Sequence, residues 1–179
     1  MKFSRMKTLL PVLLLIHLTC SYVLAQGQTL SPENAFKTAE GVVTELYRLV
    51  TFEVGQTPDW DEVESLFIDE AVIVLRTSRD STTVFSVEGF IDDFINFIEP
   101  AEVEETGFVE RIIRMRPVVI GDMAQVLVLY EASIPGSPRE PQQGIDSFLL
   151  IKKDAHWRIV AITNEIPTPD HPVPAELQK

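Results

Sequence analysis

The most constraining feature of this sequence is a change in the spacing of its apolar residues near residue 108. Before that point they recur every three or four residues, the period of a helix that buries one face. After it they alternate, the period of a β-strand, over residues 108–120, 123–134, 144–153 and 157–164. A chain that passes from helices to four long strands predicts an α+β fold, with helices packed on a mostly antiparallel sheet.

The helical half contains three capping signals. Ser31, Asp59 and Ser86 are residues whose side chains can accept a hydrogen bond from the first turn of a helix. The acidic pair Asp69 and Glu70 is expected to close the second helix. The predicted helices span residues 31–52, 59–70 and 86–100, and a hairpin of residues 71–75 and 82–85 is predicted between the second and third.

The long strands are apolar on both faces. Ile145, Leu149 and Ile151 alternate on one face of the third long strand, and Phe148 and Leu150 lie on the other. One face is expected to pack on the helices. The second face therefore needs another cover, either a closed cavity or a partner subunit.

The first 25 residues have the pattern of a secretory signal peptide. Three basic residues precede an apolar run over residues 9–18, and small residues place the cleavage after Ala25. That run is shorter than the roughly 20 residues that span a bilayer. A lipoprotein cut before Cys20 is the weaker alternative, because the residues before it fit a lipobox poorly. We therefore expect a secreted or periplasmic protein with no membrane association after cleavage.

Cleavage would leave one domain, residues 26–166, and a proline-rich tail, residues 167–179, predicted to be disordered. Cys20 is the only cysteine, so this mature chain would have no disulfide and no thiolate chemistry.

The mature chain would also keep 12 basic and 27 acidic residues, a formal charge of −15. Such a charge repels phosphate backbones and excludes nucleic acid as an expected partner. Neither His156 nor His171 has neighbours at metal-ligand spacing, so no metal and no cofactor is expected.

Four stretches together give a family resemblance: the first helix through Tyr47, residues 60–72, residues 86–90, and the final hairpin from Asp146 to Ile159. In this order they resemble the nuclear transport factor 2-like superfamily, which includes ketosteroid isomerases, SnoaL-like cyclases and scytalone dehydratase. The resemblance covers about residues 31 to 166. It implies a cone-shaped, curved, mostly antiparallel sheet wrapped by three N-terminal helices, a pocket at the wide end, and a homodimer formed through the sheet.

The resemblance also suggests functional positions. Ketosteroid isomerases use a carboxylate base on the first strand, and a tyrosine and a protonated aspartic acid as donors to the substrate oxygen. Tyr47 and Asp146 fall at the two donor positions. The base position is Val74 or Leu75, which cannot accept a proton. The implied site could therefore bind a carbonyl group but could not enolise it.

We accordingly expect a pocket for a small, largely apolar molecule, with no assignable catalytic activity. The expected ligand-binding residues are Tyr47, Phe94, Asp146 and Phe148. An alternative is an enzyme of the isomerase, cyclase or dehydratase type, with Asp146 as acid, Tyr47 as orienting donor, and Asp69 or Glu110 as base. A second alternative is a structural dimer whose pocket is filled by the side chains of Phe85, Phe94, Phe108 and Phe148.

One charged strand face could change the ligand class. Alternation along residues 108–120 puts Glu110, Arg114 and Arg116 on one face and Arg111 on the other. Such faces are commonly solvated or paired across strands. Arg114 or Arg116 could instead reach an anionic ligand.

Overall fold

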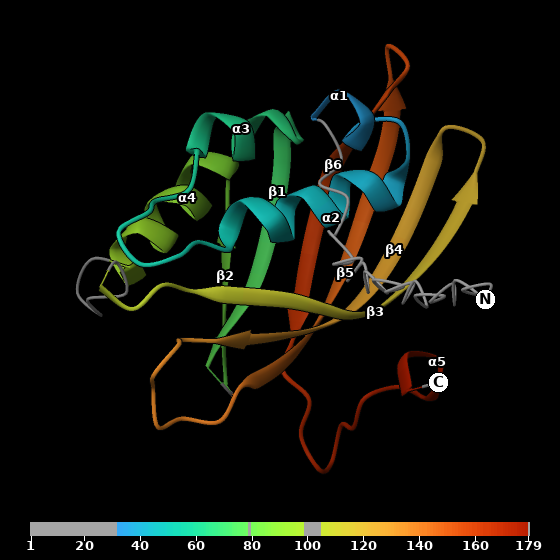
Figure 1. Ribbon diagram of the computed structural model, residues 1–179. Helices are drawn as coiled ribbons and strands as arrows, with labels where there is room; N and C mark the ends of the chain where they lie inside the picture. The colour runs from blue at the N-terminus through green and yellow to red at the C-terminus, as the bar shows by residue number, and fades with distance from the viewer. Residues whose placement is uncertain (1–31, 79, 99–104, 179) are drawn as a thin grey trace, which may run out of the picture.

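The structure, a computed structural model, describes residues 32–78, 80–98 and 105–178. This part of the chain builds a six-stranded, curved and unclosed sheet in the order β2-β1-β6-β5-β4-β3 (Figure 1). Neighbouring strands are antiparallel, except that β1 pairs with β6 in parallel. The strands are β1 (Phe67–Ser78), β2 (Ser81–Phe85), β3 (Val109–Ile120), β4 (Met123–Ser133), β5 (Gln142–Lys153) and β6 (His156–Glu165).

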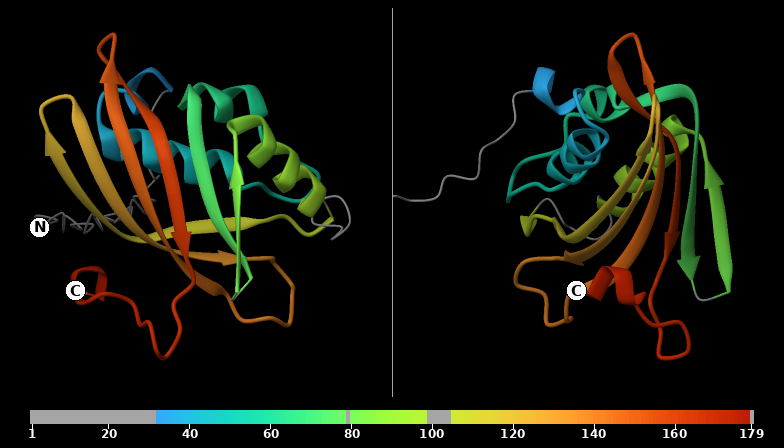
Figure 2. Two further views of the ribbon diagram at one scale, coloured as in Figure 1. Left: turned by 180° about the vertical axis from the view of Figure 1, so that it is seen from behind. Right: turned by 90° about the vertical axis from the view of Figure 1, so that its right-hand side faces the viewer.

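The helices of the first half cover the concave side of this sheet (Figure 2). They are α1 (Pro32–Ala35), α2 (Ala39–Val50), α3 (Trp60–Ser65) and α4 (Val87–Ile98), and a short α5 (Ala175–Gln178) lies near the C-terminus. The α+β class and the curved, mostly antiparallel sheet predicted from the sequence are confirmed.

The core lies between α2 and the concave face. Val42 and Val43 of α2 are fully buried, as are Ile73, Phe148 and Ile159 from three strands. Burial of side chains of this size provides most of the stability of a domain without disulfides, at about 1.5–3 kcal/mol each.

The first predicted helix is wrong in one respect, because it is broken at residues 36–38. The carbonyl oxygen of Phe36 accepts a hydrogen bond from the backbone N–H of Trp157 at 2.9 Å instead of continuing the helix. Thr38 then caps α2 by accepting from the Gly41 N–H, also at 2.9 Å. The predicted cap Ser31 lies outside the described residues.

The second predicted helix begins where expected and ends early. Asp59 caps α3 by accepting from the Glu62 N–H at 3.1 Å. Asp69 and Glu70 lie in β1 and not at the end of the helix. The reason is pairing with β6: the carbonyl of Leu66 accepts from the Ile159 N–H at 2.9 Å, which draws the chain into the sheet. The Ser86 cap of α4 is present as predicted, through the Gly89 N–H at 3.1 Å.

An irregularity in β3 changes which side chains face the concave side. The register with β4 shifts between Ile112 and Arg114, so Glu110 pairs with Ala132 on the concave face. Arg114 and Arg116 then face the convex side. The expectation that Glu110 and the two arginines share one face is therefore wrong, because one extra residue in a strand reverses the alternation.

The described part of the C-terminal segment, for which disorder is predicted over residues 167–179, includes the short helix α5. In Figure 2 α5 lies below the strands on the convex side, and Leu177 is buried. Arg116 donates from Nε to the carbonyl oxygen of Glu176 at 2.8 Å. Leu129, which faces the convex side of β4, is also buried. Within the described ranges, no helix has the length and apolar character needed to cross a membrane.

Candidate functional site

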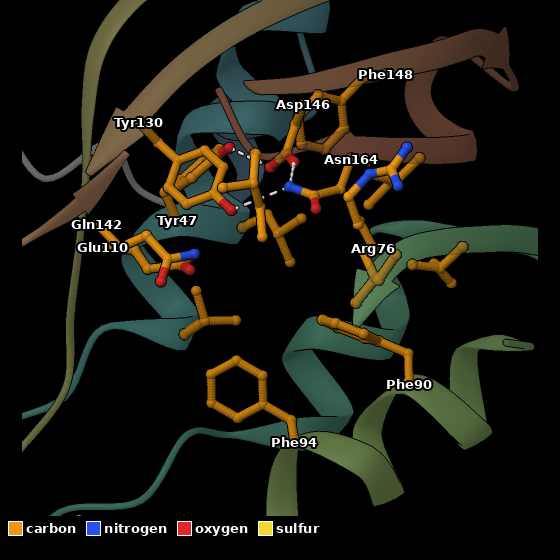
Figure 3. A pocket seen from close by; sticks show the side chains of 16 residues that line it. Tyr47, Arg76, Phe90, Phe94, Glu110, Tyr130, Gln142, Asp146, Phe148 and Asn164 are labelled. Carbon is orange, nitrogen blue, oxygen red and sulfur yellow. Dashed lines mark hydrogen bonds between the residues drawn. The ribbon is translucent and has the colours of Figure 1, made fainter. Parts of the chain in front are cut away.

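A cavity of about 220 Å³ lies between the concave face of the sheet and helices α2 and α4 (Figure 3). Its apolar walls include Leu75 of β1, Phe90 and Phe94 of α4, and Phe148 of β5. Its polar end is formed by Tyr47, Glu110, Tyr130, Asp146 and Asn164. All four predicted ligand-binding residues line this cavity, although their binding role stays a prediction.

The polar end is organised by a chain of hydrogen bonds around Asp146. Tyr47 donates its hydroxyl proton to Oδ2 of Asp146 at 2.5 Å. Asn164 donates from Nδ2 to Oδ1 of Asp146 and to the hydroxyl oxygen of Tyr130, both at 3.0 Å. The donors that the sequence assigned to a ligand, Tyr47 and Asp146, are thus bonded to each other.

Sheet register explains why these groups meet. Asp146 of β5 pairs with Asn164 of β6, so the two side chains project from neighbouring positions on the concave face. Tyr130 of β4 pairs with Gly144 of β5. A Cβ atom at position 144 would overlap the Tyr130 ring, so glycine lets the ring lie flat across β5 and places its hydroxyl beside Asn164.

Burial raises the pKa of Asp146 to about 6, while hydrogen bonds from Tyr47 and Asn164 oppose that rise. Burial also raises the pKa of the Tyr47 and Tyr130 hydroxyls, with the charge of Asp146 adding to it. At neutral pH both tyrosines therefore keep their protons, and Asp146 is largely ionised.

Glu110 is the second carboxyl group of the cavity. Burial, followed by the negative charge of Asp146, raises its pKa to about 8. Its carboxyl group projects into the cavity beside Gln142 (Figure 3), and within the described part of the chain no hydrogen bond to that carboxyl is found. Near pH 7 Glu110 is mostly a neutral acid and offers an O–H donor.

Tyr130 offers a second donor. Its hydroxyl oxygen accepts the hydrogen bond from Asn164, so its own proton is available to an acceptor in the cavity that Tyr130 lines. Tyr130, Asn164 and Gln142 were not predicted from the sequence. The signal for Asn164 was present, because the predicted pairing of the last two strands sets it opposite Asp146.

Other predicted candidates lie elsewhere. Asp69 is exposed and does not line the cavity. Arg114 and Arg116 do not line it either. Of the cavity's described lining residues only Arg76 is a cation, and it is paired with Glu165 at 2.6 Å.

Two further alternatives can be compared with the geometry. Neither Phe85 nor Phe108 lines the cavity, and Phe94 and Phe148 form its walls without filling it. The isomerase base position, Val74 or Leu75, carries no carboxyl group. In the described ranges, no three His, Cys, Asp or Glu side chains lie close enough to hold a metal ion.

Comparison with known proteins concerns the fold. No family model matches the chain, and no curated protein matches it. Among solved structures it is similar to an NTF2-like protein with a cystatin-like fold from Novosphingobium aromaticivorans, with a TM-score of 0.57, 13% identity, and coverage of 73% of this chain and 81% of that one. It is also similar to an NTF2-like protein of unknown function from Pseudomonas putida KT2440, with a TM-score of 0.57, 10% identity, and coverage of 78% and 93%.

A third similar structure is a protein of unknown function with a cystatin-like fold from Nostoc punctiforme, with a TM-score of 0.56, 10% identity, and coverage of 74% and 90%. The chain therefore has the nuclear transport factor 2-like fold, as the resemblance predicted. Identities this low show the fold alone, and the site must be argued from its own residues.

Proposed function

We propose that this protein binds a small, neutral, largely apolar molecule that carries a carbonyl or similar acceptor oxygen. The observation that carries the proposal is the pair of unmet donors, the Glu110 carboxyl and the Tyr130 hydroxyl, at one end of an apolar cavity. A pocket of this kind orients a ligand through a few polar groups and gains affinity from its apolar walls.

The charges of the cavity favour a neutral ligand. Asp146 is largely ionised near pH 7 because its pKa is about 6, and Arg76 is neutralised by Glu165. An anionic ligand would therefore meet the negative charge of Asp146, and the described lining of this cavity offers no cation outside the Arg76–Glu165 pair to balance it. A neutral oxygen, in contrast, can accept hydrogen bonds from both Glu110 and Tyr130.

Three probes of similar size test the proposal by isothermal titration calorimetry: acetophenone, ethylbenzene and benzoate. Acetophenone should bind most tightly, and Tyr130→Phe should weaken it by about three- to tenfold, the worth of one hydrogen bond. Ser147→Ala is the matched control, because Ser147 lies on the same sheet but faces its convex side. Equal binding of acetophenone and ethylbenzene, or tighter binding of benzoate, would contradict the proposal.

A specific observation favours catalysis as a second candidate. Asp146 and Glu110 share one cavity, and their environments push their pKa values to about 6 and about 8. Such a separation is how enzymes keep one carboxylate as base and one carboxylic acid as donor at pH 7. Asp146 would remove a proton from the carbon next to the carbonyl, while Glu110 would donate its proton to the carbonyl oxygen to give the enol. These roles differ from those expected from the sequence, in which Asp146 was the acid.

Proton NMR in D₂O tests this candidate directly. Catalysis predicts that the protein accelerates exchange of the methyl protons of acetophenone, and that Asp146→Asn and Glu110→Gln each abolish the acceleration. If the ketone binds but its methyl protons exchange no faster than in buffer alone, catalysis is refuted and the binding function remains.

We also infer export and self-association. Residues 1–25 have the signal-peptide pattern, so the intact mass of the chain isolated from its host should lack them.

On the convex face Val118, Ile120, Met123, Leu149 and Ile151 are exposed. A second copy would cover them, and sedimentation equilibrium should show a dimer that Met123→Glu with Ile151→Glu converts to a monomer.

A further inference from the structure

A second cavity adjoins the first. It has a volume of about 310 Å³, and three of its lining residues, Glu110, Tyr130 and Gln142, also line the first cavity. These three side chains therefore form the partition between the two spaces. Gln142 is exposed, and Figure 3 shows its side chain next to that of Glu110 at the edge of the first cavity.

The floor of the second cavity is apolar. Phe97 of α4 and Phe108 lie edge-to-face with ring centroids 5.9 Å apart, and Phe108 meets Phe94 of the first cavity in the same way at 5.5 Å. Ala132 of β4 and Ile134, just after the end of β4, are further apolar lining residues. An apolar chain leaving the first cavity would thus stay in contact with apolar atoms.

The polar lining of the second cavity comes mostly from the loop between β4 and β5. Ser137, Arg139 and Glu140 of this loop line the cavity, together with Ser133, the last residue of β4. The loop is ordered by its own hydrogen bonds: the Ser137 N–H donates to the Ile134 carbonyl at 3.1 Å, and the Arg139 N–H donates to Oγ of Ser137 at 3.2 Å. The arginine and the glutamate are adjacent and of opposite charge, so this rim offers donors and acceptors without a net charge.

We propose that the second cavity is a subsite for the polar, uncharged end of an elongated ligand whose apolar body occupies the first cavity; this rests on the proposed function. The ligand is an amphipathic molecule with an apolar body, an acceptor oxygen at the partition, and a hydroxyl-bearing end against the loop. The partition supplies Glu110 and Tyr130 as donors to the middle of such a molecule. The balanced rim selects a neutral end over an acidic one.

Four phenyl ketones test the subsite by calorimetry on the mature chain: acetophenone, hexanophenone, and the ω-hydroxy and ω-carboxy derivatives of hexanophenone. Each buried methylene raises affinity by about fourfold. The ω-hydroxy ketone should therefore bind at least about tenfold more tightly than acetophenone. It should also bind more tightly than the ω-carboxy ketone and than hexanophenone itself.

Two variants locate the effect. Ala132→Phe fills the second cavity from its floor, and Ser137→Trp fills it from the loop without touching the sheet. Each should remove the gain of the long ketones. Ser137→Trp should also change the affinity for acetophenone by less than about twofold, within the usual effect of a distant substitution; no such limit applies to Ala132→Phe, because Ala132 pairs with Glu110. Glu64→Trp, on the exposed face of α3, is the control for added bulk.

The outcomes separate the two proposals. If acetophenone binds and the longer ketones bind no better, or if Ser137→Trp weakens all ketones equally, the second subsite is wrong and the first site remains. Tighter binding of the ω-carboxy ketone would overturn the uncharged end. Failure of every ketone to bind would overturn the proposed function and this inference with it.

Discussion

Replacing Glu110 with glutamine should remove most of the stability that the protein loses as the pH rises from about 5 to about 8. The folded-state pKa of Glu110 is raised from 4.5 to about 8 by burial and by the charge of Asp146. Between these values the folded state holds a proton that the unfolded chain has released, so the free energy of unfolding falls with rising pH. Below this window the stability is fully present, and above it the loss is complete.

The magnitude follows from the size of the pKa change. Each tenfold change in acid dissociation is worth about 1.4 kcal/mol, so ionised Glu110 lowers the free energy of unfolding by up to about 5 kcal/mol. Water can enter the cavity that the carboxyl group faces and partly solvate its charge. The loss of stability should therefore lie between about 2 kcal/mol and the limit of about 5 kcal/mol. Glutamine has the same shape and no charge, so the variant should be more stable than the wild type by this amount at about pH 9 and equal to it at about pH 4.

Urea unfolding at a series of pH values, followed by the fluorescence of Trp60 and Trp157, measures the difference. Because the pKa of Asp146 is about 6, the free energy of unfolding should still fall with rising pH in both proteins below about pH 6, but less steeply. Glu64→Gln, an exposed substitution on α3, should leave the curve unchanged. If the Glu110→Gln and wild-type curves run parallel from about pH 5 to about pH 9, the cavity does not bury Glu110 as described.

Three further changes test the packing around the site. Gly144→Ala should destabilise the fold by about 1–3 kcal/mol because the new methyl group displaces the Tyr130 ring, and its ketone affinity should fall to that of Tyr130→Phe; an unchanged affinity would show that the ring is free to move. Phe148→Ala should cost about 3–5 kcal/mol in urea unfolding, since the side chain is fully buried, and a loss below about 1 kcal/mol would contradict its core position. Leu177→Ala should speed hydrogen exchange at the amide of residue 177 by at least about tenfold. Global stability should change little, because α5 packs only locally, on β3. If this amide already exchanges fast in the wild type, α5 does not stay on β3.

The fold could be predicted largely from local patterns. The change of apolar period separates the helices from the long strands, and the caps at Asp59 and Ser86 depend on neighbouring residues alone. The errors have a common cause in long-range pairing. The helix break at residues 36–38 and the early start of β1 at Phe67 both depend on hydrogen bonds with β6, about 90 or more residues away.

The site could be predicted in part. Tyr47 and Asp146 do lie together, but the sequence could not show that they bond to each other, which is why we propose Glu110 and Tyr130 as the donors to a ligand. That depends on the bulge before Arg114, which turns Glu110 to the concave side, and on the space above Gly144. Neither feature leaves a pattern in the apolar spacing, because each comes from packing between strands.

A crystal structure of the mature chain with acetophenone tests the central claim most directly. We predict the phenyl ring against the side chains of Phe90 and Phe94, and the carbonyl oxygen within hydrogen-bond distance, about 3 Å, of both the Glu110 carboxyl and the Tyr130 hydroxyl. An empty cavity under conditions where calorimetry shows binding, or a ketone seated outside the concave face, would contradict the account.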